Sequence, residues 1–302
     1  MQAFSAKGTK PTIAIVGCGT VGSAIGKLLR DVGYRISGVA TSNLETAQRA
    51  AEVTGAESYS DSPSEIALGA EVVFITTPDD LIQSICREIA DQRSFQQDAV
   101  VVHCSGALAS EILASARKCG AKVATLHPLQ SFASVDQAVS LVPGSFCTIE
   151  GDENALGMVR QIVQDLGGIV LEITAEKKTL YHAAAVAASN YLVTLIYLAL
   201  ELDKAAGLPG DTSFNALLPL IKGTLNNIGK KGIPNALTGP IARGDVATVS
   251  AHLRAIERHA PELLSLYQCL GRYTVDLAEA KKTISKEAAQ KLIALLQPQK
   301  RN

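Results

Sequence analysis

The chain has 302 residues, of which 47% are hydrophobic and 19% are charged, and its formal net charge at pH 7 is −1. This length is enough for two domains, and the near-zero charge gives no reason to expect nucleic acid or another polyanion as a partner. The six cysteines are scattered without a CxxC pair, so we expect a reducing compartment, no disulfide framework and no metal site. The first eleven residues contain no apolar run typical of a signal peptide, and we expect a cytoplasmic protein.

A glycine-rich turn near the N-terminus predicts a dinucleotide-binding fold. The apolar run Thr12–Val16 leads directly into Gly17, Cys18, Gly19, Thr20, Val21 and Gly22, which have the spacing G-x-G-x-x-G. In this pattern the first glycine allows a tight turn after the strand, the second lets the backbone approach a pyrophosphate, and the third lets the helix pack closely. A helix-like run, Ala24–Val32, and a strand-like run, Tyr34–Ala40, follow in the required order. We therefore expect the helix N-terminus to bind the pyrophosphate of a dinucleotide.

The end of the second predicted strand bears on which nicotinamide cofactor fits. NAD sites usually carry Asp or Glu about 20 residues after the glycines, where the carboxylate accepts hydrogen bonds from the ribose 2′-hydroxyl. This chain has Thr41, Ser42 and Asn43 at that place, and no carboxylate. Because a carboxylate repels a 2′-phosphate, whereas hydroxyl and amide groups can donate to one, we expect NADP rather than NAD. Arg49 in the next helix is either a clamp for that phosphate or a solvated surface residue.

Strand and helix signals alternate from Thr12 to about Ile173, which predicts an α/β domain over residues 1–173. We expect a Rossmann-type, doubly wound and mostly parallel sheet covered by helices. Its buried strands are expected at the apolar runs Val72–Thr77, Ala99–Val102 and Lys122–Leu126. A closing strand–helix–strand unit at Phe146–Gly151, Glu153–Leu166 and Ile169–Ile173 is expected to lengthen the sheet.

Polar residues follow these strands at the edge where ligands collect in doubly wound sheets. The expected cofactor contacts at this edge are Thr76, Thr77, Pro78, His103 and Ser105. His127 follows the third strand, and we expect it to take part in the reaction. A buried histidine can also be a purely structural, hydrogen-bonded residue, and for His103 both roles are open. Asp79 is expected to cap a helix that begins near Leu81.

A second, all-helical domain is predicted over residues 174–302. No proline or glycine interrupts the chain from Thr174 to Ala206, so we expect one long central helix. Ala183–Leu200 carries no charge over 18 residues, which is the minimum for a membrane span. Its polar residues and its many alanines favour a helix that is packed on all sides within the protein, and we expect no membrane contact.

Polar residues on one face of this helix form a notch among small alanines. His182 and Ser189 share that face with Lys178, and Asn190 borders it. Since buried polar groups need partners, the notch either makes helix–helix hydrogen bonds or faces a substrate. We expect His182, Ser189 and Asn190 to face the substrate.

The remainder predicts further helices at Thr212–Ile228, Val246–His259, Pro261–Leu277 and Ser285–Leu296. Arg243 lies in the loop before the second of these, and its planar guanidinium fork suits a substrate carboxylate. A salt bridge that holds the loop is an equally good use of this arginine. Asp245 is expected to cap the helix that follows.

Four motifs complete the pattern: HCSGALAS at His103–Ser110, HPLQSFA at His127–Ala133, LYHAAAVAASNYLVTL at Leu180–Leu195 and LTGPIARGD at Leu237–Asp245. Together they resemble a bacterial family that pairs a Rossmann-like domain with a C-terminal domain of unknown function. The whole chain resembles the 6-phosphogluconate dehydrogenase-like superfamily, in which a Rossmann-type half precedes a long central helix and a helical bundle. The resemblance implies this fold, NADP binding and a homodimer formed by the helical domains, but no particular substrate.

More distant families narrow the expected chemistry. Pyrroline-5-carboxylate reductase and the deazaflavin-dependent NADP reductases resemble the N-terminal half. The β-hydroxyacid dehydrogenases are similar in layout but use a lysine near an asparagine of the central helix. In this chain the residue four positions before Asn190 is Val186, so that lysine is missing. Prephenate dehydrogenases look similar at His127, which lies in a His-Pro loop after a late strand.

These patterns predict an NADP-dependent oxidoreductase that transfers hydride between nicotinamide and a small carboxylated hydroxy, keto or imino substrate. His127 or His182 would exchange the accompanying proton, because a neutral imidazole is suited to that near pH 7. The residues expected to orient the reacting group or to hold its carboxylate are Ser105, Ser189, Asn190 and Arg243. The alternative is a non-catalytic NADP-binding sensor or assembly protein, which the missing lysine favours.

Overall fold

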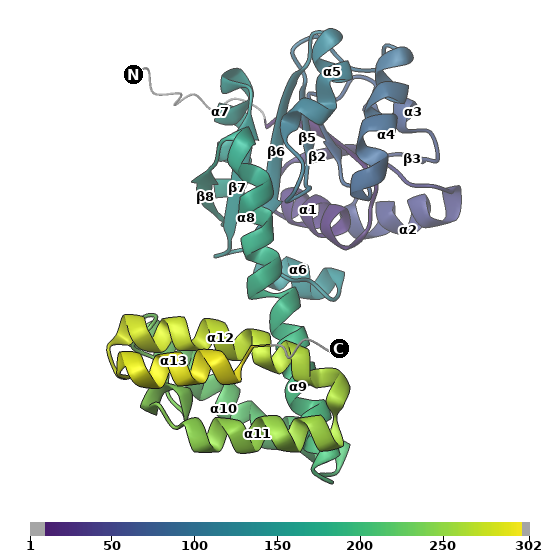
Figure 1. The fold of residues 1–302 in the computed structure, drawn as a ribbon. Helices are drawn as coiled ribbons and strands as arrows, with labels where there is room; N and C mark the ends of the chain where they lie inside the picture. The colour runs from purple at the N-terminus through teal and green to yellow at the C-terminus, as the bar shows by residue number, and fades with distance from the viewer. Residues whose placement is uncertain (1–9, 298–302) are drawn as a thin grey trace. The chain divides into compact units, whose positions relative to one another are not determined.

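The computed structural model describes residues 10–297 and divides into two compact units, one running to Ser189 and the other beginning at Asn190 (Figure 1). The first unit is built around an eight-stranded sheet. Among the described residues, the second unit contains helices and no strands. The division falls later than residue 173, because the helix that follows the sheet packs back on it through Lys178, which bonds to a strand residue.

The strands are β1 (Thr12–Val16), β2 (Arg35–Ala40), β3 (Tyr59–Ser60), β4 (Val72–Ile75), β5 (Val100–His103), β6 (Lys122–Pro128), β7 (Phe146–Gly151) and β8 (Ile169–Glu172). They lie in the order β3-β2-β1-β4-β5-β6-β7-β8. Strands β1 to β6 are parallel, whereas β7 runs antiparallel to β6 and parallel to β8. The predicted Rossmann-type, mostly parallel sheet is therefore confirmed, and the closing strand–helix–strand unit lengthens it as expected.

The helices of this unit are α1 (Thr20–Asp31), α2 (Leu44–Thr54), α3 (Pro63–Ala67), α4 (Asp79–Asp91), α5 (Ala114–Lys118), α6 (Val135–Leu141), α7 (Glu153–Asp165) and α8 (Ala175–Ala188), with a 3₁₀ turn η1 (Ser110–Leu113). Helices α1, α2 and α7 contribute to the core on one face of the sheet, and α3, α4 and α5 to the core on the other (Figure 1). Successive strand residues alternate between the two cores, as Ile15 and Val16 do.

The second unit consists of α9 (Asn190–Ala205), α10 (Gly210–Lys231), α11 (Val246–His259), α12 (Leu264–Lys281) and α13 (Lys286–Leu295), with 3₁₀ turns η2 (Ile241–Arg243) and η3 (Pro261–Leu263). Helices α11, α12 and α13 enclose a core that includes Val249, Val275 and Leu292. The expected cap of α11 is confirmed, since a carboxylate oxygen of Asp245 accepts a hydrogen bond from the N–H of Thr248 at 3.0 Å.

The long helix expected from Thr174 to Ala206 differs from the prediction in two respects. It is interrupted at Ser189, between α8 and α9. The expectation that it is packed on all sides is wrong within this chain, because Lys178 and Leu198 are its only buried residues. By length and composition Ala175–Ala205 is apolar enough to cross a membrane, a test that core helices of soluble proteins also pass. An apolar pattern predicts that a surface is covered, but it does not identify what covers it.

Candidate active site

The glycine turn joins β1 to α1 and leaves space beside its middle glycine. Gly17 has a φ of +89°, and a Cβ there would lie 2.7 Å from the backbone nitrogen of Thr77, so only glycine fits. A Cβ at Gly22 would lie 2.4 Å from the carbonyl oxygen of Gly17, which confirms that this glycine allows close packing of α1. At Gly19, in contrast, a Cβ would meet no atom within 4 Å. Open space therefore adjoins the one glycine that the motif places against a pyrophosphate.

The turn also offers polar groups without partners. Gly19 is the N-cap of α1 and has no side chain to cap it, so the first N–H groups of the helix have no side-chain acceptor. The hydroxyl of Thr77 is buried and has no hydrogen-bond partner among the described residues. Burial raises the pKa of the Cys18 thiol to about 12, so this side chain stays uncharged. The open space, the unpaired N–H groups and the positive end of the helix dipole together suit a pyrophosphate.

The loop Thr41–Asn43 connects β2 to α2 at the expected ribose end of this site. The side-chain oxygen of Asn43 accepts a hydrogen bond from the N–H of Thr46 at 2.9 Å and caps α2. Arg49 forms an ion pair with Glu45 one turn away on the same helix, so the salt-bridged surface role is the one seen. The loop itself carries no carboxylate, but Glu45 lies in the first turn of the helix that it opens.

His103 ends β5 and is completely buried. Its Nδ1 accepts a hydrogen bond from the N–H of Ser105 at 3.1 Å, so in the neutral ring Nε2 carries the proton and donates to the carbonyl oxygen of Ala109 at 3.2 Å. Burial, with the charge of Lys178 adding to it, lowers the pKa of His103 to about 4, so the ring is neutral near pH 7. Both nitrogens thus hold the loop after β5, and neither is free to bind a cofactor.

Ser105 also organises this loop. Its hydroxyl donates to a carboxylate oxygen of Asp79 at 2.8 Å and accepts hydrogen bonds from the N–H groups of Ala107 and Leu108 at 3.2 and 3.1 Å. The prediction that Asp79 caps α4 is wrong, because the helix begins at Asp79 itself with Pro78 as its N-cap, and the Asp79 carboxylate accepts from Ser105 instead. Because the hydroxyl is buried and fully bonded, Ser105 shapes the backbone that leads to Gly106.

His127 on β6 meets two aromatic side chains of α8. Its Nδ1 lies 3.0 Å from the hydroxyl of Tyr181, and its ring centroid lies 6.4 Å from that of His182, with the ring planes at 78°. A Cβ at Gly106 would lie 2.8 Å from Nε2 of His127 and 2.7 Å from Cδ2 of His182. His127 and His182, which belong to two different motifs, therefore come together beside Gly106 of the HCSGALAS motif. Any larger residue at Gly106 would displace one of the two rings.

The surroundings keep His127 neutral and leave its tautomer adjustable. Burial, with the neighbouring Lys178 and His182 adding to its effect, lowers the pKa of His127 to about 4. Burial raises the pKa of the Tyr181 phenol, which therefore keeps its proton and also reaches the hydroxyl of Thr148. Because a hydroxyl can donate or accept, Nδ1 of His127 can do either as well. The other nitrogen, Nε2, can then accept or donate a proton on the side of Gly106.

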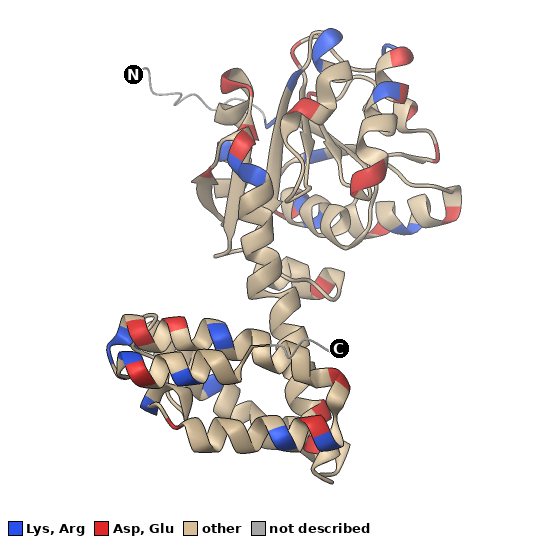
Figure 2. Cartoon of the chain, in the orientation of Figure 1, with Lys and Arg blue, Asp and Glu red and all other residues tan. Residues whose placement is uncertain are grey.

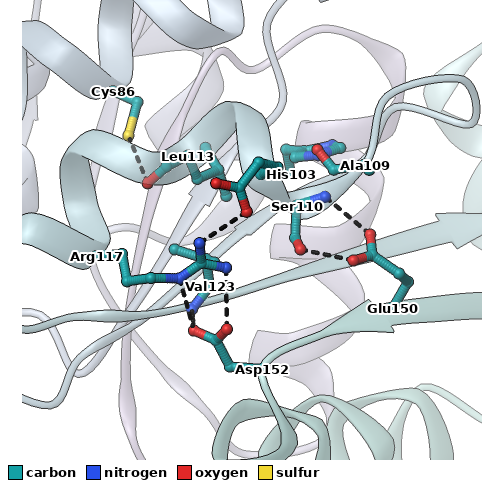
Figure 3. Close-up of polar contacts among 10 residues, drawn as sticks. Cys86, His103, Ala109, Ser110, Leu113, Arg117, Val123, Glu150 and Asp152 are labelled. Atoms are coloured by element: carbon teal, nitrogen blue, oxygen red, sulfur yellow. Dashed lines mark hydrogen bonds and ion pairs between the residues drawn. The ribbon is translucent and has the colours of Figure 1, made fainter. Parts of the chain in front are cut away.

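Thr125, Thr148, Glu150 and Tyr181 were not predicted from the sequence as site residues, and Asp79 was expected only as a helix cap. Antiparallel pairing sets Glu150 of β7 opposite Thr125 of β6, and Thr148 opposite His127. Both carboxylate oxygens of Glu150 accept hydrogen bonds from Ser110, one from its N–H at 2.8 Å and one from its hydroxyl at 2.6 Å (Figure 3). The alternating polar residues in these two apolar strands are a signal that could have revealed this face.

Lys178 of α8 adds a buried cation to the same face. Its side chain has no exposed surface, and Nζ donates to the hydroxyl of Thr125 at 2.8 Å. Burial lowers the pKa of this ammonium group to about 8, an effect that the charges of Glu150 and Asp79 oppose. The helical pattern placed Lys178 beside His182, but it did not indicate burial against the sheet.

The remaining predicted site residues are Ser189, Asn190 and Arg243. Ser189 and Asn190 are exposed at the break between α8 and α9. Arg243 belongs to the second unit, where it lines an open cavity of about 500 Å³. The polar side chains of this cavity are Thr238, Arg243, Lys281 and Thr283. Lys281 donates to the carbonyl oxygen of Leu237 at 2.7 Å, and no carboxylate is among the described lining residues.

Family models match the two parts of the sequence separately. A Rossmann-like domain matches residues 3–128, and a domain of unknown function, DUF2520, matches residues 145–274. No curated protein matches the sequence. Within residues 10–297, no three His, Cys, Asp or Glu side chains are placed to hold a metal ion.

Solved structures resemble the chain over most of its length. A protein of Thermotoga maritima is 31% identical, with a TM-score of 0.71 over 89% of this chain and 99% of its own. A protein of Bacteroides fragilis, described as a candidate NADP oxidoreductase, is 24% identical, with a TM-score of 0.73 over 89% of this chain and 99% of its own. An imine reductase of Myxococcus stipitatus in complex with NADP⁺ is 15% identical, with a TM-score of 0.68 over 95% of this chain and all of its own.

Proposed function

Because this chain belongs to the family that joins a Rossmann-like domain to a DUF2520 domain, we propose that it is an oxidoreductase that uses NADP and acts on a small carboxylated hydroxy, keto or imino substrate. One observation carries the proposal. The glycine turn after β1 and the His127–His182 cluster lie at the same edge of one sheet, because β1, β4, β5 and β6 are parallel. The structural relatives described above include an NADP⁺-bound imine reductase, which agrees with this choice of chemistry.

The residues of the turn fit the cofactor that we propose. The open space at Gly19 and the uncapped N–H groups of α1 would receive the pyrophosphate. The methyl group of Thr77 lies against Gly17, and its buried hydroxyl, which has no partner among the described residues, is proposed as a further donor at the start of this site. When bound, the nicotinamide would supply or accept the hydride, and the protein would position it and exclude water.

NADP rather than NAD is proposed for the ribose end. Thr41–Asn43 bring no carboxylate against a 2′-phosphate, and the N-terminus of α2 follows directly. Glu45 in that first turn is already paired with Arg49, which reduces its repulsion of an anion. Several groups therefore contribute to the preference for NADP, and the ratio of the affinities for NADPH and NADH measures their sum.

His127 is proposed to exchange the proton that accompanies hydride transfer. In the oxidative direction its neutral Nε2 accepts the proton of the substrate hydroxyl or amine while Tyr181 accepts from Nδ1. In the reductive direction Nε2 of His127 donates the proton to the substrate oxygen or nitrogen. His182 borders Nε2 of His127 at Gly106 and is proposed to orient the reacting oxygen or nitrogen.

The other predicted residues are proposed to handle the remainder of the substrate. Arg243 and Lys281 leave their cavity with a net positive lining, which suits a carboxylate. Ser189 and Asn190 present exposed polar groups at the helix break. Ser105 is proposed to support the loop of Gly106, since its own hydroxyl is fully bonded.

The experiment that tests this function starts with the cofactor. We expect NADPH fluorescence to change on titration with the protein, and NADH to bind more weakly; the chain has no tryptophan, so no indole signal overlaps. A panel of small keto and imino acids is then expected to contain one that drives oxidation of NADPH. Stronger binding of NADH would overturn the 2′-phosphate argument. Tight binding of NADPH without turnover on any panel member would favour the non-catalytic sensor.

We also propose that the protein is a homodimer in which each copy covers helices α9 and α10 of the other. From Ala183 to Leu200 the chain carries no charge, and this part of α8 and α9 is tan in Figure 2. The large exposed apolar side chains on these two helices include Tyr191, Val193, Leu195, Tyr197, Leu220 and Leu225. An exposed apolar surface of this kind marks a protein–protein interaction site when the protein is not inserted in a membrane.

Replacing Val193 with lysine should therefore shift the protein from dimer to monomer, because a buried ammonium without a partner opposes association. The measurement is molar mass by light scattering without detergent. Leu68→Lys is the matched control, since Leu68 is 69% exposed and Val193 is 68% exposed. A monomeric wild-type protein, or one that stays dispersed only in detergent, contradicts the dimer.

A further inference from the structure

Lys178 is an unusual residue for the position that it occupies. It is the only buried residue of α8 and lies against the sheet with no exposed surface. Lysine is among the residues least often fully buried, and an unpaired ammonium group costs several kcal/mol to desolvate. Among the described residues no carboxylate lies within ion-pair distance of Nζ, whose one hydrogen bond goes to the neutral hydroxyl of Thr125 at 2.8 Å.

The nearest carboxylates are committed to other partners. Both oxygens of Glu150 accept from Ser110 (Figure 3), and Asp79 accepts from Ser105. They offset the charge of Lys178 from a distance without contacting it. A lysine that served only to hold α8 on the sheet would be better replaced by an apolar side chain of similar volume. The geometry therefore favours a role for the positive charge itself.

Strand and helix periodicity place this charge beside His127. Thr125 and His127 are two residues apart on β6 and point to the same face, and the rise between them is about 6–7 Å. Lys178 and His182 are one turn apart on α8, a rise of about 6 Å. Lys178 bonds to Thr125, whereas Tyr181 and His182 contact His127. The ammonium group and the imidazole ring are therefore neighbours along the same face.

The other titratable groups that face Lys178 come from each element packed against it. They are Asp79 of α4, His103 of β5, Cys104 of the following loop, His127 of β6, Glu150 of β7 and, on α8 itself, Tyr181 and His182. Burial raises the pKa of the Cys104 thiol to about 12, so this group is uncharged. Lys178 is thus the one buried cation at this face among the described residues.

We propose that Lys178 is a positioning residue whose buried charge adds to the effect of burial in opposing protonation of the His127 ring, and so extends to lower pH the range in which Nε2 is available to exchange a proton with the substrate. This inference rests on the proposed function for its consequence in turnover, but not for its electrostatic basis. Lys178 does not itself touch the reacting atoms, because its side chain is enclosed between α8 and β6. Its influence reaches the reaction through the protonation of His127.

The test compares Lys178→Met with Lys177→Met, its exposed neighbour on the same helix, in the full-length protein. The first readout is the pKa of His127, measured by NMR titration without substrate and assigned with His127→Asn. For two charges about 6–10 Å apart at an effective dielectric constant of about 20, Coulomb's law gives about one to two pKa units, and we expect a rise of this size in Lys178→Met. Lys177→Met should leave it within about 0.3 units, and Lys178→Arg, which keeps the charge, should keep it low.

The second readout is turnover. On any substrate found, the acid limb of the kcat/KM profile should move to higher pH by the same amount in Lys178→Met. An unchanged His127 pKa in this variant, or an equal rise in Lys177→Met, overturns the inference. Where Lys178→Met does not fold, Lys178→Gln keeps a donor for Thr125 and removes the charge. A shifted His127 pKa in a protein without turnover would leave this inference standing and refute the proposed function.

Discussion

Replacing Gly19 with valine should lower the affinity for NADPH by about 100-fold or more without lowering the thermal midpoint of unfolding. Gly19 has a φ of −73°, which any L-residue can adopt, and a Cβ there meets no protein atom within 4 Å. The fold therefore tolerates the side chain, but the space that we assign to the pyrophosphate becomes filled. NADPH fluorescence titration and a thermal melt measure the two effects.

Gly157 provides the control for this substitution. Gly157 lies on α7 and not in the glycine turn. As at Gly19, an added Cβ would meet no atom within 4 Å. Gly157→Val should change neither the affinity nor the thermal midpoint by a comparable amount. If Gly19→Val binds NADPH as well as the wild type, the turn is structural and the proposed cofactor site is wrong.

The second large effect is expected at His127. His127→Ala should lower kcat by about 10²- to 10⁴-fold on any substrate that supports turnover, which is the range for loss of a group that transfers a proton. The affinity for NADPH should change little, because the ring is proposed to contact the substrate. Steady-state kinetics together with the cofactor titration separate the two quantities.

The chain contains a second histidine–tyrosine pair that serves as the matched control. In the helical unit, Nδ1 of His252 lies 2.8 Å from the hydroxyl of Tyr267, with the rings edge to face as at His127 and Tyr181. His252→Ala removes the same kind of contact within the helical unit, and it should leave kcat within about twofold. If His127→Ala and His182→Ala both retain full turnover on an identified substrate, the assignment of the reaction to this cluster is refuted.

The fold and the edge that carries the site could be predicted because their signals are local. A strand followed by three spaced glycines and a helix specifies a turn through backbone sterics alone, and Gly17 and Gly22 behave as that pattern requires. The uninterrupted apolar strands specify a buried parallel sheet, whose carboxyl ends collect polar residues at one edge. These local signals are enough to predict His127 at that edge.

Residues joined only by long-range pairing were not predictable in the same way. The antiparallel direction of β7 brings Thr148 and Glu150 beside β6, and nothing in the local pattern of that strand specifies direction. The hydrogen-bond partners of His103 were not predictable either. Its position after a strand indicated a ligand contact, whereas in the structure both of its nitrogens hold a loop.

The Rossmann-type sheet, the glycine turn and the strand-end histidines can be predicted from sequence, since each depends on interactions within a few consecutive residues. The burial of Lys178 against Thr125, while most of the apolar helix around it is exposed, is visible only in the folded chain. Periodicity states which residues share a face, but burial depends on which distant segment packs against that face. That choice is made by the sum of contacts over the whole unit, and no single stretch of sequence contains it.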